Sequence, residues 1–126
     1  MSVTVLANLN RKFSSISANS AAPTSLIKPP SPGRRFRVID ILACNTLSVD
    51  TTVSVFIREQ DAKDMSSHRA DFFLVKDMFI PANTSVEIID GNYPIYWENI
   101  GSSYFDHLMA YAGSAGMDII IGMNEE

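Results

Sequence analysis

The sequence predicts an all-β fold, an antiparallel jelly-roll-like β-sandwich with an extended N-terminal arm. Residues 51–58 alternate strictly, with Val53, Val55 and Ile57 on one face and mostly polar neighbours on the other. Turn residues separate apolar runs at spacings of about 8–12 residues, which is typical of antiparallel sandwiches and barrels. No window longer than ten residues carries a helical apolar period, which argues against an α/β fold.

Seven strands are expected after Gly33, and one or two more before it. The later strands are predicted at 36–44, 51–58, 71–76, 85–89, 94–98, 103–112 and 117–123, and the earlier ones at 24–28 and 3–6. The first two of the later strands are interpreted as a hairpin, and residues 90–92 (Asp-Gly-Asn) as a tight turn. About eight strands favour a jelly roll. An immunoglobulin-like sandwich is the alternative, although the Cys–Trp–Cys core of antibody domains is absent.

The chain is divided into an N-terminal arm, residues 1–23, and a β-sandwich domain, residues 24–126. The arm is rich in Ser, Asn and Ala, so it is too polar to form its own core, yet it is too apolar for a flexible linker. We therefore expect it to pack on another chain. Tyrosine and tryptophan are also favoured at buried contacts. The predicted partner-binding residues are Val5, Leu6, Leu9, Phe13, Ile16, Tyr93, Tyr96 and Trp97.

Bulk composition limits the partners. The chain has 126 residues, a length that suits one domain with its own core, and 46% of them are hydrophobic. The net charge is −4, which gives no electrostatic reason to bind nucleic acid or an anionic membrane. No signal peptide or membrane span is recognised. We expect a soluble protein made in the cytoplasm.

No constellation of catalytic residues stands out. The single cysteine, Cys44, is expected to be a packed core thiol. Asp61, Asp64 and His68 share one polar loop, where solvated side chains are expected in preference to a metal site. His107 is expected to be half-buried and hydrogen-bonded to a neighbour. No sequence pattern pairs two carboxylates as a glycosidase would require. The sequence thus predicts no enzyme, no cofactor and no metal.

From Arg35 onward the chain resembles small virion proteins of tailed bacteriophages, of the type common in marine and cyanobacterial phages. The residues that carry the resemblance are RVIDILACNT at 37–46, VSVFI at 53–57, FFLVKD at 72–77, IPANTS at 80–85, PIY at 94–96 and MDIIIGM at 117–123. The order and spacing of these pieces, which span about three quarters of the chain, are more specific than any one piece. Residues 98–102 depart from the pattern, and the arm has no counterpart. The resemblance implies a β-sandwich building block of the particle with no catalytic residues.

Three functions are weighed. The first is a virion structural protein, expected to be a homo-oligomer, with a trimer favoured, that contacts the major capsid protein or other virion proteins. Capsid decoration as a cement protein is preferred, and a neck, tail or baseplate position is the alternative. The second is a carbohydrate-binding module that uses Tyr93, Tyr96, Trp97 and Tyr104 as a stacking shelf. The third, a cupin-type enzyme, is disfavoured because two separated histidines cannot supply its metal cluster.

Overall fold

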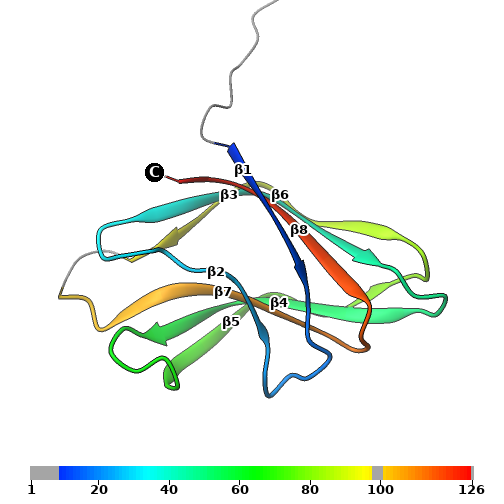
Figure 1. The fold of residues 1–126 in the computed structure, drawn as a ribbon, viewed down its shortest axis with the longest axis horizontal. Coiled ribbons are helices and arrows are strands. Elements are labelled where there is room, and N and C mark those ends of the chain that lie inside the picture. Colours follow the sequence, from blue (N-terminus) through cyan, green and yellow to red (C-terminus); the bar gives the residue numbers. More distant parts are fainter. Residues whose placement is uncertain (1–8, 98–100, 126) are drawn as a thin grey trace, which may run out of the picture.

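The structure, a computed structural model, describes residues 9–97 and 101–125, and these contain strands and no helix (Figure 1). The strands are β1 (Leu9–Ser15), β2 (Thr24–Ile27), β3 (Arg35–Asn45), β4 (Thr51–Asp61), β5 (His68–Ile80), β6 (Ser85–Tyr96), β7 (Tyr104–Ala112) and β8 (Met117–Glu125). The predicted all-β fold class is confirmed.

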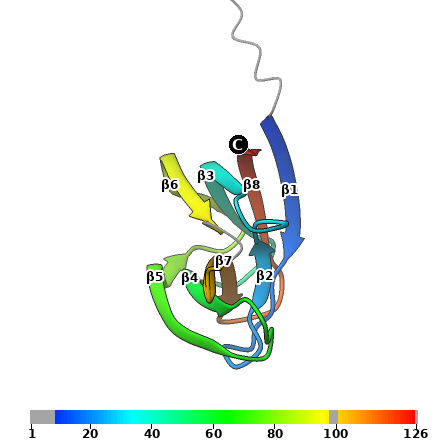
Figure 2. The same ribbon diagram turned by 90° about the vertical axis from the view of Figure 1, so that its left-hand side faces the viewer.

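Two four-stranded antiparallel sheets face each other (Figure 2). Sheet A has the order β1-β8-β3-β6, and sheet B has the order β2-β7-β4-β5. The chain crosses between the sheets at every connection except β4–β5, which is a hairpin within sheet B. This double-sheet arrangement of eight strands is a jelly roll. The predicted hairpin of residues 36–44 and 51–58 is wrong, because β3 lies between β6 and β8 while β4 lies in the opposite sheet.

The core fills the space between the two sheets. Alternate residues of each strand point inward, as the pleat requires. Sheet A contributes Ile41, Ile119 and Ile121, and sheet B contributes Val55 and Leu108, all with no exposed surface. The loops after β2 and β4 lie at one end of the sandwich, on the left in Figure 1, with the last residues of β6 and the first of β7. The β3–β4, β5–β6 and β7–β8 connections lie at the other end.

The described part of the predicted arm belongs to the sandwich. Residues 9–15 form β1, which pairs with β8 from Leu9–Asn124 to Ser15–Asp118 without a break in register. Ile16 is buried in the core. The structure thus places residues 9–16 in the sandwich and not in a separate arm, and contact of this segment with another chain stays a prediction. The apolar residues of this segment are spaced too irregularly to predict a strand from the sequence. The strand is evident only from its pairing with β8.

The expected turn at residues 90–92 is also wrong. These residues lie inside β6, which runs without interruption from Ser85 to Tyr96. Along β3 the register steps from Val38–Tyr93 to Asp40–Asp90, so β6 carries one extra residue at this point. A Gly-Asn pair suits such a bulge as well as it suits a turn, because both need an irregular backbone. The neighbouring strand decides between the two.

Substitution of two adjacent residues of β8 tests which face of this strand packs in the core. Ile121 is fully buried, whereas Ile120 faces outward and is only partly covered. We expect Ile121→Ala to lower the free energy of unfolding by about 2–5 kcal/mol and Ile120→Ala to lower it by roughly 1 kcal/mol. Urea unfolding of both variants measures the difference. Equal losses, or a larger loss for Ile120→Ala, would contradict the register.

Candidate functional site

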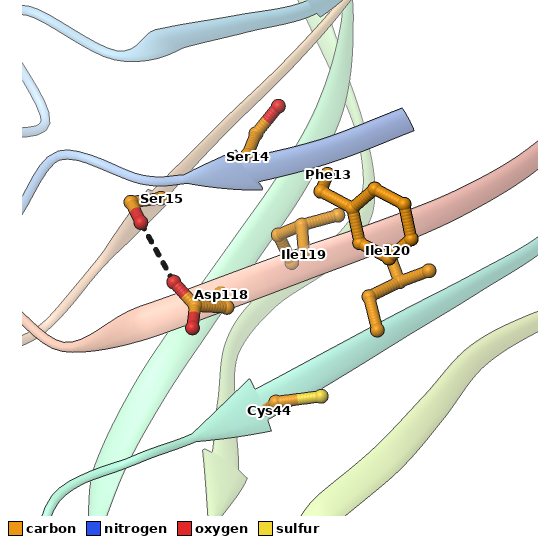
Figure 3. Close-up of a pocket in the computed structure, with 7 residues that line it drawn as sticks. All are labelled: Phe13, Ser14, Ser15, Cys44, Asp118, Ile119 and Ile120. Carbon is orange, nitrogen blue, oxygen red and sulfur yellow. Dashed lines mark hydrogen bonds between the residues drawn. The ribbon is translucent and has the colours of Figure 1, made fainter. Parts of the chain in front are cut away.

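The outer face of sheet A carries a shallow apolar groove across β1, β8 and β3 (Figure 3). Phe13 lies opposite Ile120 in the β1–β8 pairing, and 70% of its surface is exposed. The groove has a volume of about 280 Å³. One rim is polar, because the Ser15 hydroxyl donates to Asp118 Oδ1 at 2.7 Å. An apolar floor with a polar rim is the composition of a protein–protein contact.

Cys44 lies in this groove and not in the core. Within β3 its neighbours Ala43 and Asn45 point inward, so the pleat turns the thiol outward. The thiol is half-buried and accepts a hydrogen bond from the Ser85 hydroxyl at 3.2 Å. The expectation of a packed core thiol is wrong, because the alternation of the strand outweighs the buried preference of cysteine.

The outer face of sheet B carries an aromatic cluster. Phe56 lies at its centre, with the rings of Phe73 and Tyr111 at centroid distances of 5.0 Å and 6.1 Å. The Lys76 ammonium lies 5.1 Å from the Phe73 centroid, and the Arg58 guanidinium lies 5.5 Å from that of Phe56. Phe56 is fully buried although it points away from the core, because these side chains cover it.

The β5 strand adds further exposed aromatic surface at the edge of sheet B. Phe72 and Phe79 are 58% and 59% exposed, and Phe73 is partly exposed beside them. Phe73 lies opposite Phe56 and Phe79 lies opposite Thr52, so both point to the outer face, whereas Phe72 lies opposite the core residue Ile57 and points to the other face of the edge strand. Single exposed apolar residues are common in monomers, but this much exposed aromatic surface on one edge strand favours association. Neither these phenylalanines nor the groove on sheet A follow from the sequence motifs.

A series of hydrogen-bonded, buried polar side chains links β2, β7 and β4 within sheet B. Gln60 Nε2 donates to the carbonyl oxygens of Met65 and Ser67, at 3.1 Å and 2.8 Å. Its Oε1 therefore accepts from His107 Nδ1 at 3.0 Å, and His107 Nε2 accepts from the Ser25 hydroxyl at 2.6 Å. The expectation that His107 is hydrogen-bonded to a neighbour is confirmed. Its side chain is more deeply buried than expected, because only 4% of the residue is exposed.

The serine–histidine pair is poorly suited to nucleophilic catalysis. Burial lowers the pKa of His107 to about 4, and the positive charges of Lys28, Arg58 and Lys12 add to the effect. A general base for serine must accept a proton near neutral pH and be stabilised as an imidazolium. The neutral amide of Gln60 supplies no such stabilisation. We interpret the chain of hydrogen bonds as a lock that ties the edge strand β2 to the centre of sheet B.

A polar pocket of about 310 Å³ lies at the end of the sandwich where β6 ends and β7 begins. Arg69 forms an ion pair with Glu59, and its guanidinium lies 4.2 Å from the centroid of the Tyr104 ring. Asp106 accepts a hydrogen bond from the backbone N–H of Tyr96 at 3.1 Å. Ser102 and Phe105 complete the lining.

The predicted partner-binding residues separate into several places. Val5 and Leu6 lie outside the described residues, and Leu9 lies in β1. Phe13 is exposed on sheet A, whereas Ile16 is in the core. Of the aromatic residues, Tyr96 lines the end pocket, and Trp97 is half-buried and stacks on Phe105, another lining residue, at 4.5 Å. Tyr93, which like Tyr96 is 36% exposed, is not among the lining residues.

The carboxylates of the β4–β5 loop hold the loop itself together. Asp61 accepts hydrogen bonds from the backbone N–H groups of Lys63 and Asp64, and Asp64 accepts from Ser66. His68 lies 3.8 Å from Asp71, which is already paired with Arg58. Within residues 9–97 and 101–125, no group of three His, Cys, Asp or Glu side chains is placed to hold a metal ion. The same residues contain no helix long and apolar enough to cross a bilayer.

Comparison with known proteins gives little. No protein-family model and no curated protein matches the chain. Among solved structures it is similar to one described as "Structure of infectious bursal disease virus Gx strain", with a TM-score of 0.41 and 8% sequence identity. The match covers 92% of this chain and 37% of that one, so this chain spans little more than a third of its length. A similarity of this size says nothing about function.

The buried histidine predicts a pH-dependent stability. The folded-state pKa of about 4 lies below the ordinary value of 6.5, so the unfolded chain binds the proton first as the pH falls. The stabilisation is complete above pH 6.5 and is lost between there and pH 4, by roughly 3 kcal/mol in all. Urea unfolding at several pH values measures the slope. His107→Asn should be less stable at neutral pH and should lose this part of the slope, and an unchanged slope would contradict the assignment.

Proposed function

We propose that this chain is a non-enzymatic structural component of a tailed-phage virion that assembles as a homo-oligomer and decorates the capsid. The observation that carries the proposal is the exposed aromatic surface on the outer face of sheet A and along the edge strand β5 of sheet B. Phe13 on sheet A, and Phe72 and Phe79 on sheet B, expose more than half of their surface. Covering such surface removes apolar area from water, worth about 25 cal/mol per Å².

Two features support a place in a virion. The jelly roll is a compact block whose faces, edges and ends stay available to neighbours. The resemblance of residues 37–46, 53–57, 72–77 and 117–123 to small virion proteins of tailed phages falls on β3, β4, β5 and β8. These strands build the centres of both sheets and the edge strand β5, so the resemblance concerns the framework itself.

The net charge of the chain supports a location on the outside of the shell. A net charge of −4 gives no attraction to the DNA inside a capsid and suits a protein bound to its outer surface. A neck, tail or baseplate position shares the fold and the exposed faces, and it is the second candidate. Self-association as a trimer remains our preferred state, because a closed ring leaves one outer face of each subunit for the shell.

Localisation in the particle tests the role directly. Purified phage particles are separated into capsids and tails, and an antibody raised against this chain detects it in each fraction. We expect the chain in the capsid fraction, in a stoichiometry comparable to that of the major capsid protein. Detection only in tail fractions would refute decoration and retain a structural role. Absence from all virion fractions would refute the proposal.

Substitutions on β5 test whether its exposed phenylalanines drive self-association. We expect the double substitution Phe72→Ser and Phe79→Ser to weaken self-association about tenfold or more while the free energy of unfolding stays near that of the parent chain. Val49→Ser is the matched control, because Val49 is equally exposed but lies on the β3–β4 connection. Analytical ultracentrifugation measures the association.

Alkylation of Cys44 provides a separate test of whether assembly covers the groove on sheet A. If assembly covers the groove, alkylation of Cys44 by a maleimide should be slower in the assembled protein than in the dissociated one. A parent chain that stays monomeric at high concentration, together with an unchanged alkylation rate on particles, would contradict assembly through either face.

A further inference from the structure

One long side of the sandwich is formed by two edge strands, β5 of sheet B and β6 of sheet A (Figure 2). Phe72 on β5 pairs with the core residue Ile57, and Tyr93 on β6 pairs with the core residue Val38. Directly opposed residues lie on the same face of a sheet, so both aromatic side chains point towards the space between the sheets. They nevertheless keep 58% and 36% of their surface exposed, so the core is incompletely covered here.

Phe72 and Tyr93 lie at the same level of the sandwich. Their partners Ile57 and Val38 are each six residues away from the positions that pair with the two ends of the β5–β6 connection. At about 3.3 Å per residue, both rings lie about 20 Å from that connection. We call the space that they flank the lateral opening. Along the same two strands, towards the connection, lie partly buried residues that pack against the core: Leu74, Val75, Ile88 and Ile89.

The opposite side of the sandwich, between β1 and β2, is closed by the chain itself. The Lys12 ammonium of β1 donates to the carbonyl oxygen of Leu26 in β2. In the β1–β2 connection, the backbone N–H of Ser17 donates to Thr24 Oγ1 at 2.8 Å. Ile16 and Leu26 are buried on this side. The chain thus covers the core along one side of the sandwich and leaves apolar surface exposed along the other.

The edge of β5 favours insertion of side chains over the addition of a long strand. Its register against β4 shifts at three places, and Asp77 has a φ of 50°. Irregularities of this kind blunt an edge strand against regular pairing. An occupant of the lateral opening therefore gains its binding energy by burying apolar side chains beside Phe72 and Tyr93.

The eight residues before β1, MSVTVLAN, have a composition that suits this opening. They lie outside the described residues, they carry no charged side chain, and Val3 and Val5 alternate with polar neighbours. In an extended segment this alternation puts both valines on one face. Eight extended residues reach about 26 Å, enough to follow the opening over most of its length.

The pairing of sheet A favours the opening of a neighbouring copy over that of the same chain. Asn10 of β1 is linked through Met123 and Val38 to Tyr93, in one row across the four strands. Three strand spacings of about 4.8 Å put the ends of this row about 14 Å apart. To enter the opening of its own chain, the segment has to turn back and spend about four residues on this crossing. In a neighbouring copy all eight residues are available.

We propose that residues 1–8 of one copy dock in the lateral opening of a neighbouring copy, with Val3 and Val5 packed between Phe72 and Tyr93. The proposal rests on the self-association put forward above and assigns a surface to it. Each copy is both donor and acceptor of a segment, as the closed ring of a symmetric oligomer requires.

Two phenylalanines of β5 form a matched pair for the first test. Phe72 and Phe79 are equally exposed, but Phe79 lies opposite Thr52 and points to the outer face. We expect Phe72→Ser to weaken self-association about tenfold and Phe79→Ser to weaken it less than about threefold, as measured by analytical ultracentrifugation. An equal or larger effect of Phe79→Ser would overturn this inference and leave self-association standing. A parent chain that stays monomeric would overturn both.

Paramagnetic broadening in NMR spectra identifies which copy supplies the segment. Chains with Cys44→Ser and Thr4→Cys carry a nitroxide at residue 4, whose side chain alternates with the two valines, and are mixed with isotope-labelled Cys44→Ser chains. We expect the amide resonances of Phe72 and Tyr93 in the labelled chains to broaden more than those of residues 113–116, at the other end of the sandwich.

The remaining outcomes of the mixing experiment contradict the proposal. Broadening at Phe72 and Tyr93 that appears only when the nitroxide and the isotope are in the same chain places the segment in its own opening and refutes the exchange between copies. Associated chains without broadening at these two residues refute docking in the lateral opening, while the proposed self-association stands.

Discussion

Burial of the two facing sheet surfaces is the constraint on which the rest of the molecule depends. Ile41, Ile119 and Ile121 from sheet A meet Val55 and Leu108 from sheet B, and all five are excluded from water. Because side chains alternate along a strand, a slip of one residue would expose an entire apolar set. The core therefore fixes the register of each strand, and the register in turn decides which side chains reach the surface.

The outer faces are a direct consequence of that register. Once Ile119 and Ile121 point inward, Ile120 must point outward, and the β1–β8 pairing places Phe13 beside it. On sheet B the same alternation places Phe56 and Tyr111 outside. The molecule thus carries apolar surface on both sides of its core, which a solitary domain does not need for stability and an assembling subunit can use.

The ends of the sandwich follow a different physical rule, because water reaches the space between the sheets there. Inward-facing positions that would be apolar in the middle of β4 and β7 are Glu59 and Asp106 at this end. Nearby, His107 is completely enclosed and stays neutral, since burial and the charge of Lys28 oppose its protonation. His107 is thus enclosed with both ring nitrogens hydrogen-bonded, whereas Glu59 and Asp106 line the end pocket.

The all-β class, the approximate strands and the inward face of β4 could be predicted from the sequence, because the alternation of Val53, Val55 and Ile57 is a local property. The sequence did not predict everything. It left the strand character of residues 9–15, the bulge at 90–92 and the outward position of Cys44 undetected. Each of these features depends on which strand lies alongside, or on which face of the strand packs against the core. The end pocket shows the same limit: Glu59 and Asp106 are far apart in the chain, and only the pairing of β4 with β7 brings them together. Side-chain periodicity is encoded locally, whereas the partner of each strand is chosen by burial across the whole fold.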